Sequence, residues 1–134
     1  MSRRVAPPSG AAPPTHATLA GVDVALLPLA EAVADRYFAE FPEDLERYGE
    51  AARAWEVHDT QYCLQWAILD VEESADLERE IAWLANILRS RGFPLEHLAR
   101  NLELAADVAE EQLGEPGLTV AERLLTGTAL VRAV

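Results

Sequence analysis

An all-helical domain is the fold class that this sequence predicts, and three observations support it. Apolar residues recur at intervals of three and four along five stretches between residues 24 and 131, which is the spacing of one buried helix face. Alternation of apolar and polar residues is confined to short runs, so the sustained pattern of a half-buried strand is missing. With 134 residues, 50% of them apolar, the chain has the size of one domain. We therefore predict a four- to five-helix bundle or a globin-like helical domain.

The first 20 residues differ from the rest in composition. They contain four of the eight prolines, two arginines and no acid. Such a stretch buries too little apolar area to offset the entropy that it loses on ordering. We predict a disordered Pro/Ala-rich tail over residues 1–20 and a single helical domain over residues 21–134.

The first predicted helix covers residues 24–41, and Pro42 ends it or starts a short turn that runs through Tyr48. The second helix begins near Glu50 and carries an unbroken apolar seam at intervals of four and three, dominated by aromatic residues. The seam residues are Tyr48, Ala52, Trp55, Asp59, Tyr62, Trp66 and Leu69.

Three further helices follow from capping signals. Ser74 is the expected N-cap of a third helix that ends at Gly92. The fourth covers residues 94–113. A capping box at Thr119–Glu122 predicts a fifth, shorter helix, which Gly127 weakens.

Asp59 is the most informative candidate site residue, because it occupies a seam position where a core-facing helix places an apolar residue. His58 adjoins it and Tyr62 lies four residues after His58, so one interpretation is a ligand or partner site. The other interpretation is a structural carboxylate that pairs with Arg36 or Arg100 of a neighbouring helix.

Two histidines raise the question of a metal or haem site. His97 lies in the first turn of the fourth predicted helix, and with His58 it forms a pair that binds a metal or haem iron if the helices bring the two together. A carboxylate-bridged di-iron centre needs Glu-x-x-His on two helices, and neither histidine has Glu three residues before it. We assign no metal ligand, and the alternative is two unrelated histidines.

The three tryptophans have two interpretations as well. Trp55, Trp66 and Trp83 either line a pocket for a flat apolar ligand or belong to the core, which is where aromatics at helical spacing usually lie.

Several enzyme classes are excluded by composition. All 11 basic residues are arginine, so a Schiff-base lysine and a P-loop lysine are both absent. Cys63 is the only cysteine and lies in mid-helix among aromatics, which favours a core thiol over a nucleophile. Gly-rich phosphate loops, His-Glu-x-x-His and Gly-x-Ser-x-Gly are missing. We therefore assign no catalytic residue.

The formal net charge of −12 excludes some partners. An acidic surface repels the phosphates of nucleic acids and of anionic membranes, so we expect neither to bind. Prolines and glycines interrupt the uncharged stretch 5–22, which is neither a signal core nor a membrane span. We expect a cytoplasmic protein.

Part of the chain resembles helical sensor domains, some of them globin-like, that are found at the front of bacterial regulators. The resemblance extends over residues 25–113 and implies a sensor or adaptor role without assigning any functional residue. It lies in FPEDLERYG at 41–49, Asp59 with Tyr62, Trp83–Leu84, and RGFPLEHL at 91–98.

We predict a non-enzymatic regulatory or adaptor domain that acts through protein–protein contacts, with or without a small ligand as its input. The alternative is a small-molecule or tetrapyrrole (haem) carrier that uses a Trp-lined core and His97, and a third is an enzyme with an unrecognised site. Trp83 and Ile87 lie off the apolar stripe of the third helix, so we expect a homodimer unless the fifth helix covers them. The predicted ligand or partner site comprises His58, Asp59, Tyr62, Trp55, Trp66 and His97.

Overall fold

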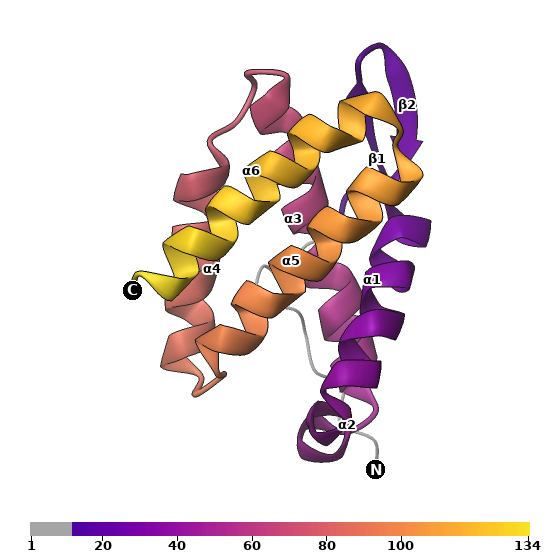
Figure 1. Cartoon of the computed structure of the whole chain (residues 1–134). Coiled ribbons are helices and arrows are strands. Elements are labelled where there is room, and N and C mark those ends of the chain that lie inside the picture. The colour runs from indigo at the N-terminus through magenta and orange to yellow at the C-terminus, as the bar shows by residue number, and fades with distance from the viewer. Residues whose placement is uncertain (1–11) are drawn as a thin grey trace.

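The structure is a computed structural model and describes residues 12–134. Within these residues the chain forms six helices and one small antiparallel hairpin (Figure 1), which confirms the all-helical class. None of the helices in this part of the chain is long and apolar enough to cross a membrane. The helices are α1 (Leu26–Glu40), α2 (Pro42–Tyr48), α3 (Ala51–Val71), α4 (Leu77–Ser90), α5 (Leu95–Gln112) and α6 (Glu115–Arg132).

The hairpin was not expected from the sequence. Strand β1 (His16–Leu19) pairs antiparallel with β2 (Val22–Ala25). Ala20 and Gly21 form a two-residue turn with φ values of 51° and 78°, the left-handed conformation that tight hairpin turns require. The prediction of a disordered tail is therefore wrong for residues 16–19, while residues 1–11 lie outside the described part of the chain.

Burial anchors this hairpin to the helices. Ala17 and Leu19 are buried and belong to the core, whereas the residues between and beside them are exposed. The backbone amide of Leu26, at the start of α1, donates to the carbonyl of Thr15 at 2.9 Å. Gln61 of α3 donates its side-chain amide to the carbonyl of Pro14 at 3.0 Å. The segment that precedes β1 is thus fixed by α1 and α3.

The turn between α3 and α4 differs in detail from the prediction. Asp76, not Ser74, caps α4: its carboxylate accepts from the backbone amide of Arg79 at 3.3 Å. Ser74 instead closes α3, where its amide bonds to the Leu69 carbonyl at 2.7 Å and Glu73 takes a left-handed φ of 61°. This arrangement satisfies carbonyl groups at the end of α3 that have no partner within the helix.

Asp70, in the last turn of α3, links three helices. One oxygen of its carboxylate accepts from the backbone amide of Leu77 at the start of α4, at 2.8 Å. The other oxygen accepts from Nε of Arg123 in α6, at 2.9 Å. The same side chain therefore helps to cap α4 and to hold α6 against α3.

Helices α5 and α6 form an antiparallel pair that lies across the other long helices (Figure 1). The start of α6 was predicted too late: the helix begins at Glu115, with Pro116 in its first turn, so Thr119 lies inside the helix instead of capping it. The pair approaches closely at Gly117, where an added Cβ would lie 2.3 Å from the carbonyl oxygen of Ala109.

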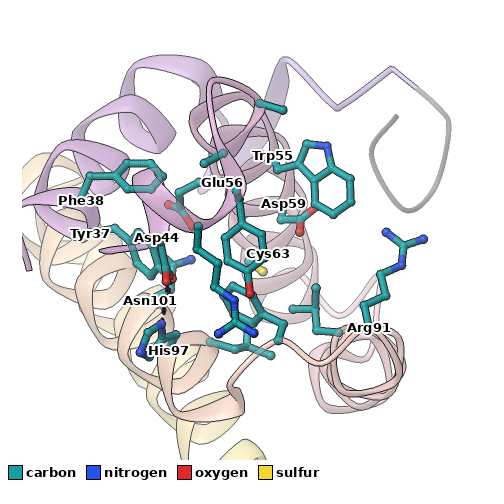
Figure 2. A pocket seen from close by; sticks show the side chains of 17 residues that line it. Tyr37, Phe38, Asp44, Trp55, Glu56, Asp59, Cys63, Arg91, His97 and Asn101 are labelled. Atoms are coloured by element: carbon teal, nitrogen blue, oxygen red, sulfur yellow. Dashed lines mark hydrogen bonds and ion pairs between the residues drawn. The ribbon is translucent and has the colours of Figure 1, made fainter. Parts of the chain in front are cut away.

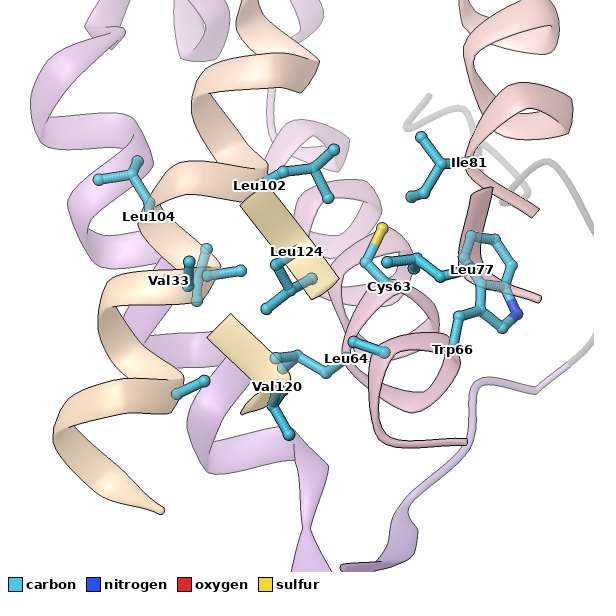
Figure 3. Packing of buried hydrophobic residues seen from close by; sticks show 14 of the residues in the cluster. Val33, Cys63, Leu64, Trp66, Leu77, Ile81, Leu102, Leu104, Val120 and Leu124 are labelled. Atoms are coloured by element: carbon cyan, nitrogen blue, oxygen red, sulfur yellow. The ribbon is translucent and has the colours of Figure 1, made fainter. Parts of the chain in front are cut away.

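One apolar core joins all the long helices (Figure 3). Val33 of α1, Leu64 of α3, Leu102 of α5 and Leu124 of α6 are fully buried in it. Cys63 is buried in the same core, as the sequence indicated. This packed interior fixes the positions of α1, α3 and α5, whose ends carry the site described next.

Candidate functional site

A pocket of about 340 Å³ opens between α1, α2, α3 and the segment that joins α4 to α5 (Figure 2). Its wall is mostly apolar, with a small number of polar groups. Figure 2 shows Tyr37 and His97 on one side of the pocket, and Trp55 and Arg91 on the other. The apolar and aromatic side chains that line it include Phe38, Tyr48, Trp55, Leu88, Phe93 and Leu98.

Tyr37, Asp44 and His97 form a hydrogen-bonded cluster in one wall. Asp44 is only 3% exposed, and its Oδ2 accepts a short hydrogen bond from the Tyr37 hydroxyl. Nδ1 of His97 lies 3.0 Å from the same oxygen, within hydrogen-bond distance. The His97 ring stacks on Phe41 with a centroid separation of 4.0 Å. Burial, together with the bond to Asp44, raises the pKa of Tyr37, which keeps its hydroxyl protonated.

Glu56 forms a second polar group with Thr60 and Asn101. Thr60 Oγ1 donates to Glu56 Oε2 at 3.0 Å. With the Asn101 amide turned so that Nδ2 faces Glu56, it donates to the two carboxyl oxygens at 3.1 and 3.0 Å. With Nδ2 turned to Thr60 instead, it donates to Oγ1 at 3.0 Å, but its Oδ1 then faces the acceptor oxygens of Glu56. The first orientation satisfies both the nitrogen and the oxygen of the amide, because Oδ1 then accepts from Thr60 Oγ1 at 3.0 Å.

Burial raises the pKa of Glu56 well above its ordinary value, and the negative charges of Asp59 and Asp44 raise it further. The hydrogen bond from Thr60 and the positive charge of Arg53 lower this pKa, but they do not offset the increase. The cause is that an apolar wall solvates a carboxylate poorly. Burial also raises the pKa of the Cys63 thiol, which lines the pocket. A thiol of raised pKa is a weak nucleophile.

Two arginines lie over aromatic rings at the edge of the pocket. The guanidinium carbon of Arg47 is 5.5 Å from the centroid of Tyr48, and that of Arg91 is 5.4 Å from the centroid of Trp55. Both arginines are exposed. Their charges are therefore screened by water far more than those of the acids inside.

A second, smaller pocket of about 190 Å³ gathers four of the six residues predicted from the sequence: His58, Asp59, Tyr62 and Trp66. Successive rings along this face lie 5.0 Å apart from His58 to Tyr62 and 5.7 Å apart from Tyr62 to Trp66. Trp83 of α4 continues the row, edge-on to Trp66 at 6.5 Å, and is 47% exposed.

Asp59 lines both pockets. Its Oδ1 lies 3.0 Å from Nδ1 of His58, which is itself buried. Neither predicted arginine pairs with it: Arg36 bonds to Glu111 at 2.7 and 2.8 Å, and Arg100 bonds to Glu40 at 2.7 Å. The prediction that Asp59 pairs with Arg36 or Arg100 is therefore wrong.

The six residues that the sequence predicted as one site are divided between the two pockets. His97 and Trp55 line the larger pocket, whereas His58 and Trp66 line the smaller one. The three tryptophans therefore do not surround a common interior, contrary to the idea of a single Trp-lined core. Within residues 12–134 no group of three or more His, Cys, Asp or Glu side chains is arranged to hold a metal ion.

Sequence reasoning missed Tyr37, Asp44, Glu56 and Asn101 as site residues. They come from four different helices, so only tertiary packing brings them together. A weak signal was present at Asn101, an amide between the buried Leu98 and Leu102.

No protein-family model, curated protein or solved structure matches the chain. The resemblance of residues 25–113 to helical sensor domains stays a prediction.

Proposed function

We propose that this chain is a regulatory domain that binds a small molecule in the larger pocket and acts through contacts with another protein. The pocket carries this proposal: about 340 Å³ of mostly apolar space with a few oriented polar groups lies within the range of about 300 to 1,000 Å³ of small-molecule sites. Glu56 and the Asp44–His97 pair supply the directional groups that such sites use to orient a ligand.

Binding in the pocket is tested with a variant that fills it. Ala52 is buried and lines the pocket, so Ala52→Phe places a ring in the space for a ligand. Ala129→Phe, at an exposed position of α6, is the matched control. A library of small molecules is screened for compounds that raise the thermal midpoint of the wild-type chain.

We expect hits that stabilise the wild type and Ala129→Phe but not Ala52→Phe, because a ligand that binds only the folded state raises its stability. Native circular dichroism of Ala52→Phe verifies that the variant is folded. A screen without hits, or hits that stabilise Ala52→Phe equally, contradicts the proposal.

The protein contact is proposed at the exposed face of α4. Trp83 is 47% exposed beside the smaller pocket, and a large aromatic in such a position is typical of interfaces. A homodimer through this face is the simplest form of the contact. Light scattering tests it: twice the chain mass of 14.7 kDa for the wild type and a single chain mass for Trp83→Ala are expected. A single chain mass for the wild type at all concentrations removes the homodimer.

A further inference from the structure

Three carboxyl groups face the larger pocket, and they differ in whether a basic side chain accompanies them. Asp44 has His97 at 3.0 Å and Asp59 has His58 at 3.0 Å. Glu56 makes no ion pair with any basic side chain in residues 12–134; its partners there are the uncharged Thr60 and Asn101. Among residues 12–134, the pocket therefore contains one acid, Glu56, whose carboxyl group has no basic side chain in ion-pair contact.

The surroundings of Glu56 disfavour its charge when the pocket is empty. The groups that face it are the acids Asp44 of α2 and Asp59 of α3, with Arg53 as the basic contributor; Tyr37 of α1 and His97 of α5 lie beyond Asp44 and are bonded to it. A cation placed next to the carboxyl group reverses this balance, because an opposite charge within about 4 to 6 Å favours the ionised acid.

The aromatic wall suits a cation as well. Tyr48 and Trp55 already hold guanidinium groups near their ring faces at 5.5 and 5.4 Å. Aromatic faces attract cations through the ring quadrupole. Phe38 and Phe93 line the same pocket and supply apolar surface for the rest of a ligand.

An anionic ligand has less to bind. The arginines that line the pocket, Arg47 and Arg91, are exposed at its edge, and the chain as a whole carries a net charge of −12. A negative net charge favours the approach of cations to the chain over that of anions.

We infer that the pocket takes a small organic cation, an ammonium group on an apolar or aromatic body, with the ammonium beside Glu56. This inference rests on the proposed function, and it names the chemical class of ligand. Where Glu56 is neutral before binding, the step is an exchange: the carboxylic acid releases one proton to solvent and the carboxylate pairs with the incoming ammonium. Net charge is conserved, and no other reactant is needed.

Three probes with one ring system test the charge preference: 2-naphthylmethylamine, 2-naphthylmethanol and 2-naphthoate, measured by titration calorimetry at pH 7. We expect the amine to bind at least about tenfold more tightly than the alcohol, and the naphthoate to bind most weakly. Glu56→Gln keeps the shape of the side chain and one acceptor oxygen but removes the negative charge, so it should weaken the amine about tenfold and leave the alcohol within about twofold. Glu50→Gln, which removes an exposed acid just before α3, is the matched control and should change neither.

Proton release provides an independent readout. Titrations of the amine in phosphate and in Tris differ in heat if a proton is released, and this difference should vanish in Glu56→Gln. Equal affinity for the amine and the alcohol, preference for the naphthoate, or an amine affinity unaffected by Glu56→Gln overturns the inference and leaves a pocket for ligands of another charge. Failure of all three probes to bind the wild type also overturns it, while the library screen with Ala52→Phe still decides separately whether the pocket binds small molecules at all.

Discussion

Nδ1 of His97 lies 3.0 Å from Oδ2 of Asp44, and this contact joins the first turn of α5 to the short helix α2. Since Tyr37 of α1 donates to the same oxygen, a single buried carboxylate holds three helices around one end of the larger pocket. The wall on that side is therefore built by polar contacts, whereas the core behind it is built by apolar packing.

Asp44→Ala should lower the free energy of unfolding by about 2 kcal/mol or more, because each buried donor left without an acceptor costs about 1 to 3 kcal/mol. Asp44→Asn keeps one oxygen acceptor and should cost less. Urea titration measures both variants. Glu43→Ala, an exposed acid of the same helix, is the control and should change stability by less than about 0.5 kcal/mol. An Asp44→Ala chain as stable as the control would show that the cluster contributes nothing to the fold.

Glu56 makes the stability of the chain depend on pH in a predictable direction. Its pKa is raised in the folded chain, so between the ordinary glutamate value and the folded value the folded state holds more protons than the unfolded state. The free energy of unfolding therefore falls as pH rises through this window, and the loss is absent below the ordinary pKa of about 4.3.

Glu56→Gln should accordingly be more stable than the wild type near neutral pH and lose this advantage near pH 4. Urea titrations of both chains between pH 4 and 7 measure the difference, with Glu50→Gln as a control that should show no such trend. A difference between Glu56→Gln and wild type that stays constant with pH would mean that the carboxyl group ionises as freely in the folded chain as in the unfolded one.

The hairpin should contribute measurably to stability although it is small. Leu19→Ala removes a side chain that is 4% exposed and should cost about 2 to 3 kcal/mol. Val22→Ala, in the partner strand and 63% exposed, should stay within about 0.5 kcal/mol of the wild type. Thermal and urea unfolding compare the two, and equal small effects would indicate that β1 does not pack on the helices in solution.

Helix positions were predictable because a buried face leaves a periodic record in the sequence. The intervals of three and four in the predicted helices recur in α1, α3, α4 and α5 within a few residues of their ends. The hairpin left a weaker record, since Ala20–Gly21 lacks the Asn-Gly signature of two-residue turns and each strand has only four residues. At α6, the pattern Thr119–Glu122 resembled a helix start but lies inside the helix. The correct signal was Pro116, three residues before Thr119, because proline is common in the first turn of a helix.

The candidate site was predictable only where one helix carries it. His58, Asp59, Tyr62 and Trp66 lie together because the spacing along α3 already places them on one face. The larger pocket was not predictable, because its polar groups come from four helices and its volume depends on how those helices cross. Glu56 in particular has no sequence signal: one charged residue on a helix is ordinary until a neighbouring helix buries it.

The bonds of Asp70 join segments separated by very different lengths of chain, seven residues to Leu77 and 53 residues to Arg123. Detaching α6 would leave the carboxylate with one of its two partners and would loosen the turn at which α4 begins. We therefore expect local opening of the C-terminal helix to weaken the α3–α4 junction, so that hydrogen exchange at the start of α4 should follow exchange in α6.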